Sequence, residues 1–234
     1  MPSLGSVASN GTSSEPKQLA LALDHAESLA RDDFLAGPSN AAALAFIERW
    51  PDWPQRTMLL VGPEGSGKSH LAAIWSRAAG ARVLAARALD GAGIPAALAT
   101  GTLVLEDLTE GRFDEAALFH LLNLGREERA FILVTARSAP GGWQAELPDL
   151  ASRLRALPAV VLSVPDDALF RAVIVKLFAD RQLIVEEILI SYLVTRIERS
   201  FAAARTAVEA LDRAALRLQR PVTRALAGEL FREP

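Results

Sequence analysis

The chain has 234 residues and a formal net charge of −3; 50% of its residues are hydrophobic and 23% are charged. This length fits one α/β domain with a small accessory domain. The negative charge argues against an autonomous duplex-DNA binder, which needs a concentrated basic face. No cysteine is present, which excludes disulfides, thiolate catalysis and cysteine metal sites.

The first 17 residues are rich in Ser, Gly, Asn and Pro, and they contain neither an apolar signal core nor the amphipathy of a transit peptide. We expect residues 1–17 to form a disordered tail on a cytoplasmic protein. No apolar run reaches the roughly 20 residues that a membrane helix needs, so we expect no membrane span. The scattered positions of His25, His70 and His120 argue against a zinc site.

A polar turn at residues 31–40 precedes a predicted helix from Ala41 to Trp50, with Ser39 or Asn40 as its cap. Short apolar runs then alternate with helical stretches. The predicted strands are Thr57 to Gly62, Ala81 to Ala85, Leu103 to Leu105, Phe131 to Val134 and Val160 to Val164, and helices between them include Leu71 to Ala79, Asp114 to Glu127 and Leu147 to Ala156. This alternation predicts an α/β domain at residues 31–164, with a five-stranded parallel sheet covered by helices on both faces.

The strand pattern stops at Pro165. Four helical segments follow: Asp166 to Arg181, Val185 to Arg196, Phe201 to Leu218 and Val222 to Phe231. They predict a small, all-helical lid domain at residues 165–234.

Residues 62–69 read GPEGSGKS and match the phosphate-binding pattern GxxxxGK[ST], between a predicted strand and a predicted helix as the motif requires. Its glycines turn backbone N–H groups toward an anion, and the helix N-terminus adds a favourable dipole. Lys68 would bridge the β- and γ-phosphates, and the Ser69 hydroxyl would hold Mg²⁺. The pattern predicts a site for ATP or ADP with Mg²⁺, formed by Pro63, Glu64, Gly65, Ser66, Gly67, Lys68, Ser69 and His70.

The run Leu103 to Leu105 ends in two acids, Glu106 and Asp107. A P-loop needs a carboxylate on a neighbouring strand to hold magnesium and orient water. An Asp normally takes the first position, whereas here Glu106 does, and its longer side chain would reach the metal through a water molecule. We therefore expect weak intrinsic ATP hydrolysis. Thr135, which ends the next strand, would position the attacking water, or it is an ordinary threonine at the end of a buried strand.

Arg153 lies in the predicted helix between the fourth and fifth strands. In P-loop assemblies of this architecture, that helix faces the neighbouring subunit. An arginine inserted in trans stabilises transition-state charge. As an isolated feature, such an arginine is more often a solvated helix residue.

Together these segments resemble the Hda proteins, relatives of the replication initiator DnaA that keep its AAA+ module and lack its DNA-binding domain. Residues 147–154 (LPDLASRL) are similar to that family's arginine-finger segment, and residues 18–23 (QLALAL) to its signal for the DNA polymerase sliding clamp. Residues 33–40 (DFLAGPSN) resemble the stretch that frames adenine, which assigns Phe34 to the cofactor site. The resemblance covers roughly residues 18–232.

The resemblance implies a negative regulator of replication initiation that is bound to a nucleotide and to the sliding clamp (β subunit). It would stimulate hydrolysis of the ATP bound to DnaA, with Arg153 acting on the partner's nucleotide and DNA contacted only through the clamp. Such a chain is mainly an ATPase activator. Because an arginine finger works only across an interface, we expect some self-contact, and monomers or weak dimers when the chain is alone.

Residues 18–30 would then be the clamp-binding segment and a linker. Gln18, Leu19, Leu21 and Leu23 would dock in an extended conformation into an apolar groove of the clamp. Alternatively, these leucines belong to the first strand or helix of the core.

One departure from the family concerns its sensor arginine. Ala202 stands at that position, with Arg199 and Arg205 on either side, and we expect Arg199 to contact the nucleotide. Two other classes of function stay open. An AAA+ loader or placement factor for a helicase or the initiator would share this core but needs no clamp signal. A P-loop kinase would carry an arginine-rich lid inserted in the sheet, which the helical segments after residue 165 argue against.

Overall fold

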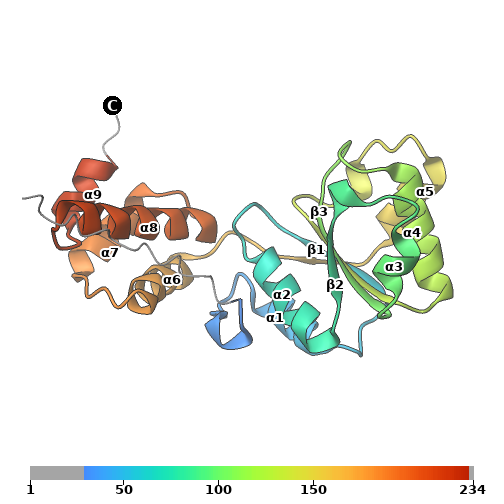
Figure 1. Cartoon of the computed structure of the whole chain (residues 1–234), viewed down its shortest axis with the longest axis horizontal. Helices are drawn as coiled ribbons and strands as arrows, with labels where there is room; N and C mark the ends of the chain where they lie inside the picture. Colours follow the sequence, from blue (N-terminus) through green and yellow to red (C-terminus); the bar gives the residue numbers. More distant parts are fainter. Residues whose placement is uncertain (1–28, 232–234) are drawn as a thin grey trace, which may run out of the picture.

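The computed structural model describes residues 29–231, and these fold into a sheet domain followed by a helical lobe (Figure 1). The strands are β1 (Thr57–Val61), β2 (Arg82–Ala85), β3 (Thr102–Leu108), β4 (Phe131–Ala136) and β5 (Ala159–Val161). The α-helices are α1 (Ala41–Glu48), α2 (Lys68–Ala79), α3 (Ile94–Leu98), α4 (Glu115–Glu127), α5 (Pro148–Ala156), α6 (Asp167–Asp180), α7 (Glu187–Arg196), α8 (Phe201–Leu218) and α9 (Arg224–Leu230). Three 3₁₀ turns are η1 (Arg31–Asp33), η2 (Ala86–Ala88) and η3 (Pro140–Gly142).

The five strands form one parallel sheet in the order β2-β3-β4-β1-β5, which confirms the predicted sheet. Strand β4 therefore lies between β1, which leads into the P-loop, and β3, which carries the two acids. Because all strands are parallel, these three segments end at the same edge of the sheet. The register between β3 and β4 shifts after Leu105, immediately before the acids.

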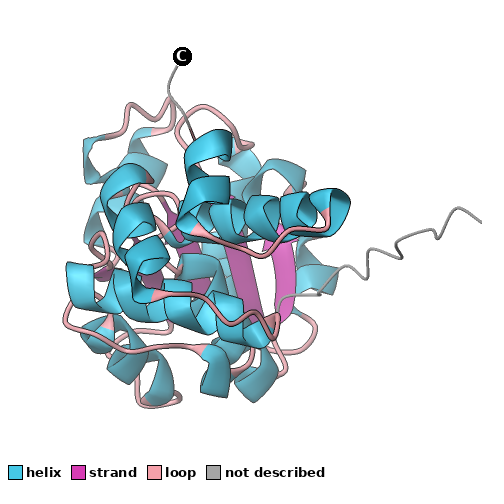
Figure 2. Ribbon diagram, turned by 90° about the vertical axis from the view of Figure 1, so that its left-hand side faces the viewer, coloured by secondary structure: helices cyan, strands magenta, loops and turns pink. Residues whose placement is uncertain are grey.

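Helices cover both faces of the sheet (Figures 1 and 2). Alternate residues of each central strand point to opposite faces. On one face, Leu59, Leu105 and Ile132 pack among residues of α3, α4 and α5. On the other face, Leu60 and Leu133 pack among residues of α1 and α2 that include the buried Trp75. These two buried layers fix the strand ends that carry the site.

The helical lobe has its own hydrophobic core, built around Phe170, Phe178 and Leu211. Side-chain caps define the starts of three of its helices, since Asp166, Ser200 and Thr223 each accept a backbone hydrogen bond from the first turn of α6, α8 and α9. None of the helices in residues 29–231 is both long and apolar enough to cross a membrane.

Several local expectations are corrected. Strand β5 is Ala159–Val161, shorter than the predicted Val160 to Val164. The Ser163 N–H donates instead to the Ser39 carbonyl (3.2 Å), so the chain leaves the sheet there. Helix α3 was not predicted, because it is only 5 residues long and carries a proline in its first turn. Asn40 precedes α1 but makes no side-chain cap; its side chain holds the preceding loop through Leu35 and Gly37.

Candidate functional site: a cavity between the P-loop and the helical lobe

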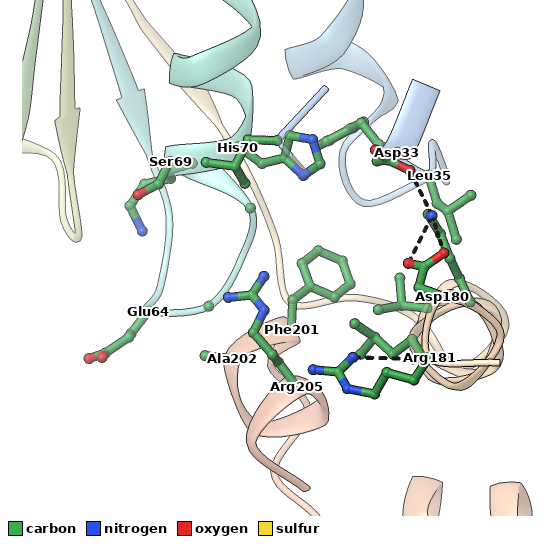
Figure 3. Close-up of a pocket in the computed structure, with 18 of the residues that line it drawn as sticks. Asp33, Leu35, Glu64, Ser69, His70, Asp180, Arg181, Phe201, Ala202 and Arg205 are labelled. Atoms are coloured by element: carbon green, nitrogen blue, oxygen red, sulfur yellow. Dashed lines mark hydrogen bonds and ion pairs between the residues drawn. The ribbon is translucent and has the colours of Figure 1, made fainter. Parts of the chain in front are cut away.

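A cavity of about 590 Å³ lies where the P-loop meets the helical lobe (Figure 3). Four segments form its walls: residues 29–35, the P-loop with the start of α2, the ends of β3 and β4, and helices α6 and α8 of the lobe. The lining residues are Leu29, Asp33, Phe34, Leu35, Glu64, Gly65, Gly67, Lys68, Ser69, His70, Asp107, Arg137, Val173, Lys176, Leu177, Asp180, Arg181, Phe201, Ala202 and Arg205. This volume lies within the range of small-molecule and cofactor sites.

The P-loop backbone has the conformation that its glycines predict. Gly65 and Gly67 have φ values of 69° and 98°, a region that residues with a Cβ rarely adopt. A Cβ on Gly62 would lie 2.8 Å from the Leu162 carbonyl oxygen. Helix α2 begins at Lys68, directly after this loop, so its unpaired N–H groups meet the cavity where an anion would bind.

The Lys68 ammonium lies at the centre of the loop and is only 7% exposed as a residue. It donates hydrogen bonds to the carbonyl oxygens of Gly62 and Pro63, both at 2.7 Å. Burial lowers the pKa of Lys68, while the charge of Asp107 opposes that shift. A buried cation with a lowered pKa is stabilised by an anionic ligand, so this site fits a phosphate group.

The two acids at the end of β3 take different positions. Asp107 is exposed and lines the cavity, whereas Glu106 is half-buried and does not line it. Burial raises the pKa of Glu106, and the charge of Asp107 raises it further; a hydrogen bond from Ser69 acts in the opposite direction. The structure thus brings together Ser69 and Glu106, the two residues predicted to share a magnesium ion.

Thr135 lies at the end of β4 and is 1% exposed. Its hydroxyl oxygen accepts a hydrogen bond from the Asp107 backbone N–H at 3.0 Å. Asp107 has a φ of 57°, so this bond supports a left-handed backbone at a non-glycine residue. Thr135 does not line the cavity, and its observed contact positions Asp107.

Away from Glu106 and Asp107, the cavity is lined by apolar side chains of residues 29–35 and α6 together with the charged Asp33, Lys176 and Asp180. Phe34 is 6% exposed and makes an edge-to-face contact with His70, with ring centroids 5.1 Å apart. Leu35 lies nearby, and Val173 and Leu177 of α6 complete this region. Apolar side chains beside an anion-binding loop suit an amphiphilic ligand with a flat base and a charged tail.

Two contacts connect the helical lobe to the sheet domain at this cavity. The Phe201 N–H donates to the Gly65 carbonyl at 2.8 Å, so the start of α8 rests directly on the P-loop. Lys176 of α6 donates to Asp33 at 2.8 Å and also pairs with Asp180 (Figure 3). Hydrogen bonds to Asp33 and then to Asp180 raise the pKa of Lys176.

The structure corrects the expectation for the lobe arginines. Arg199 does not line the cavity; its guanidinium pairs with Asp167 at 2.6 Å and its side chain is 52% exposed. Arg205 lines the cavity instead, and Figure 3 shows it extending from α8 alongside the P-loop. Helix α8 begins at Phe201 after the capping Ser200, so Arg199 precedes the helix. Arg205 lies four residues after Phe201, so the two side chains lie on the same face of α8.

Arg153 lies in the last turn of α5 and does not line this cavity. Its guanidinium rests over the Phe119 ring of α4, 4.9 Å from the centroid. Arg153 borders a second cavity of about 450 Å³, with Arg56 and Arg126, near the edge of the sheet where β1 and β4 begin. Within the chain, the predicted finger is therefore separate from the P-loop.

Several predicted site residues are not brought to the cavity surface. Ser66 is 2% exposed, and Pro63 contributes its carbonyl oxygen to Lys68 without lining the cavity. The clamp-binding prediction for Gln18, Leu19, Leu21 and Leu23 lies outside the described residues. Among residues 29–231, no group of three or more His, Asp and Glu side chains is arranged to hold a metal ion by itself.

Sequence reasoning missed Lys176, Asp180 and Arg137 as cavity residues. The first two come from a lobe helix whose docking against residues 29–35 no local pattern reveals. Arg137 follows β4 directly, and the position of β4 beside the P-loop strand could have indicated it.

The chain resembles known proteins in structure rather than in sequence. No protein-family model matches it, and no curated protein matches it significantly. Several solved structures, however, are similar to it in fold. Domain III of the Thermotoga maritima replication initiator DnaA is 16% identical, with a TM-score of 0.70 over 88% of this chain and 98% of that one. The chain has the AAA+ fold.

Two further structures have the same fold. AMPPCP-bound DnaA from Aquifex aeolicus is 17% identical, with a TM-score of 0.61, over 77% of this chain and 64% of that one. A single-residue variant of Thermotoga maritima RuvB is 16% identical, with a TM-score of 0.66, over 86% of this chain and 70% of that one. At these identities the likeness establishes the AAA+ fold alone.

Proposed function

We propose that the cavity binds an adenine nucleotide, ATP or ADP, as the first step of this protein's function. The observation that carries the proposal is the buried Lys68 in a glycine-rich loop with left-handed glycines, in a cavity that also offers the apolar side chains of Phe34 and α6. The phosphates would lie against the P-loop, and the base would lie between Phe34 and α6. DnaA of the same fold is described with bound AMPPCP, which supports this assignment.

Magnesium fits the same arrangement. Ser69 offers a hydroxyl oxygen and Glu106 a carboxylate, and Ser69 lies close enough to Glu106 to lower the pKa of its carboxyl. A bound Mg²⁺ would neutralise charge between the terminal phosphates. Asp107 projects into the cavity and would orient water, while Thr135 holds Asp107 in place. We expect slow turnover, because Glu106 replaces the usual aspartate at the first position.

The proposed regulatory role is that of an Hda-like protein. In this proposal the chain binds the sliding clamp, and through the clamp DNA, and stimulates hydrolysis of the ATP held by the initiator DnaA. Arg153 lies on α5, outside the chain's own cavity, and in this proposal it would act on a neighbouring molecule's nucleotide. Head-to-tail contacts of this kind need not close into a ring, which fits a monomer or weak dimer in isolation.

Clamp capture tests this role. Purified sliding clamp should be retained by the wild-type chain and not by the variant with Gln18→Ala and Leu19→Ala. The matched control is the variant with Leu216→Ala, which removes an exposed leucine on α8. No capture by the wild type would move the assignment to an AAA+ loader or placement factor, which shares the fold and needs no clamp segment.

A further inference from the structure

An ion pair spans the acidic end of the cavity. Arg137 Nη1 lies 2.6 Å from Glu64 Oε2, and both residues line the cavity. Glu64 belongs to the P-loop, and Arg137 is the first residue after β4. Glu64 belongs to the predicted phosphate-binding segment, whereas Arg137 was not predicted as a site residue.

The sheet fixes the position of Arg137 relative to the phosphate-binding loop. Val61 of β1 is paired with Ala136 of β4, and the Gly62 N–H donates to the Ala136 carbonyl at 3.1 Å. Arg137 therefore begins beside the first residue of the loop. It shares this end of the cavity with Asp107, whereas Phe34 marks the other end. A terminal phosphate extending from the loop toward the acids would meet this part of the wall.

The charges of Arg137 and Glu64 both affect the pKa of Lys68. Behind the larger effects of burial and Asp107, Arg137 lowers the pKa of Lys68 and Glu64 raises it. Arg137 thus adds positive charge close to the cationic centre of the cradle, and Glu64 partly offsets it.

The ion pair between Arg137 and Glu64 is weak enough for Arg137 to exchange Glu64 for a phosphate group. The Arg137 and Glu64 side chains are 58% and 69% exposed, and pairs this exposed contribute little to stability. A guanidinium binds phosphate through two parallel, charge-assisted hydrogen bonds. The Glu64 carboxylate, in contrast, repels a phosphate. Binding of a triphosphate would therefore favour exchange of Glu64 for phosphate as the partner of Arg137.

We propose that Arg137 is a contact for the terminal phosphate of the chain's own nucleotide, and that Glu64 competes with this phosphate for it. The pair then determines how strongly the cavity prefers a nucleoside triphosphate over a diphosphate. The inference rests on the proposed nucleotide binding.

The test compares the affinities for AMPPCP and ADP, measured by calorimetry in Mg²⁺ buffer. Arg137→Ala should weaken AMPPCP binding about 10-fold or more, the size expected for a charged hydrogen bond, and change ADP binding less than about 2-fold. Glu64→Gln should shift the preference the other way, by tightening AMPPCP binding. Arg112→Ala makes the same change in net charge at an exposed residue that does not line the cavity, and it should leave both affinities unchanged.

The two variants separate this role from a structural one. If the pair only stabilises the P-loop, Arg137→Ala and Glu64→Gln will both weaken AMPPCP and ADP by equal factors, and the inference is wrong. That result would leave nucleotide binding itself intact. If the wild-type chain binds neither nucleotide, the proposed function fails, and this inference fails with it.

Discussion

The hydroxyl oxygen of Thr135 accepts the backbone N–H of Asp107, which joins the end of β4 to the acidic end of β3. Asp107 is held there in a left-handed conformation, immediately after the register shift between the two strands. A single buried hydroxyl thus directs a carboxylate into the cavity.

Replacing Thr135 by Val keeps the shape of the side chain and removes this acceptor. Leaving the partly buried N–H without a partner should lower the free energy of unfolding by about 1–3 kcal/mol. The intrinsic ATPase rate should also fall, because Asp107 loses its support. Thr135→Ser retains the hydroxyl and is the matched control. Thermal unfolding and single-turnover hydrolysis measure the two effects, and equal behaviour of the Val and Ser variants would contradict this role for the hydroxyl.

Lys68→Met should remove nucleotide binding without destabilising the free protein. The lowered pKa of Lys68 means that folding disfavours its charged form, so its contribution to stability is unfavourable below the lowered pKa and is relieved as the pH rises toward 10.5. Methionine carries no such penalty at neutral pH. Wild-type protein with ADP at 100 times its Kd should gain about 2.7 kcal/mol of stability, and the variant should gain none. A variant that unfolds far more readily without nucleotide would contradict this account of Lys68.

Gly65→Ala should separate the helical lobe from the P-loop. A Cβ there would lie 2.7 Å from the Ser200 Cβ, at the start of α8. We expect weaker nucleotide binding, because Phe201, Ala202 and Arg205 would be displaced from the cavity. Gly111 has nearly the same φ, 68°, with no atom within 4 Å of its Cβ position, so Gly111→Ala reports the backbone strain alone. Equal affinities in the two variants would show that contact with the lobe does not matter for binding.

Lys176→Met should weaken nucleotide binding by loosening the contact between α6 and residues 29–35. The Lys176 and Asp33 side chains are 25% and 30% exposed, so we expect a loss of unfolding free energy of only about 1 kcal/mol or less. Because the pKa of Lys176 is raised, this contribution is fully present below pH 10.5 and is lost only as the pH rises through the raised value. Measurements at pH 7 and 9 should therefore give the same difference from wild type.

The parts of the site predicted from sequence depend on short stretches of chain. Residues 62–69 contain the whole phosphate loop, and the alternating pattern around them gives the sheet. Glu106 and Asp107, near the end of β3, were indicated in the same local way by the apolar run before them. Contacts between the lobe and the sheet domain, such as Phe201 with Gly65, join residues far apart in the chain, so no periodicity indicates them.

The error at Arg199 has a similar cause. The predicted helix already began at Phe201, where α8 begins, so the helix boundary does not explain the choice of Arg199. Arg205 lines the cavity because the start of α8 rests on the P-loop through Phe201 and Gly65, a contact between residues far apart in the chain. Likewise, the pairing of Glu64 with Arg137 depends on the strand order, which places β4 rather than β3 beside the P-loop strand.

The proposed function is activation of DnaA-bound ATP hydrolysis by this chain through Arg153. It is tested most directly by following single-turnover hydrolysis of ATP bound to DnaA, in the presence of sliding clamp loaded on DNA. The wild-type chain should accelerate hydrolysis, and Arg153→Ala should abolish the acceleration while binding its own nucleotide normally. Arg155→Ala, which removes an exposed arginine from the same helix, should behave as wild type. Acceleration that persists undiminished in Arg153→Ala, or no acceleration by the wild type, would contradict the account.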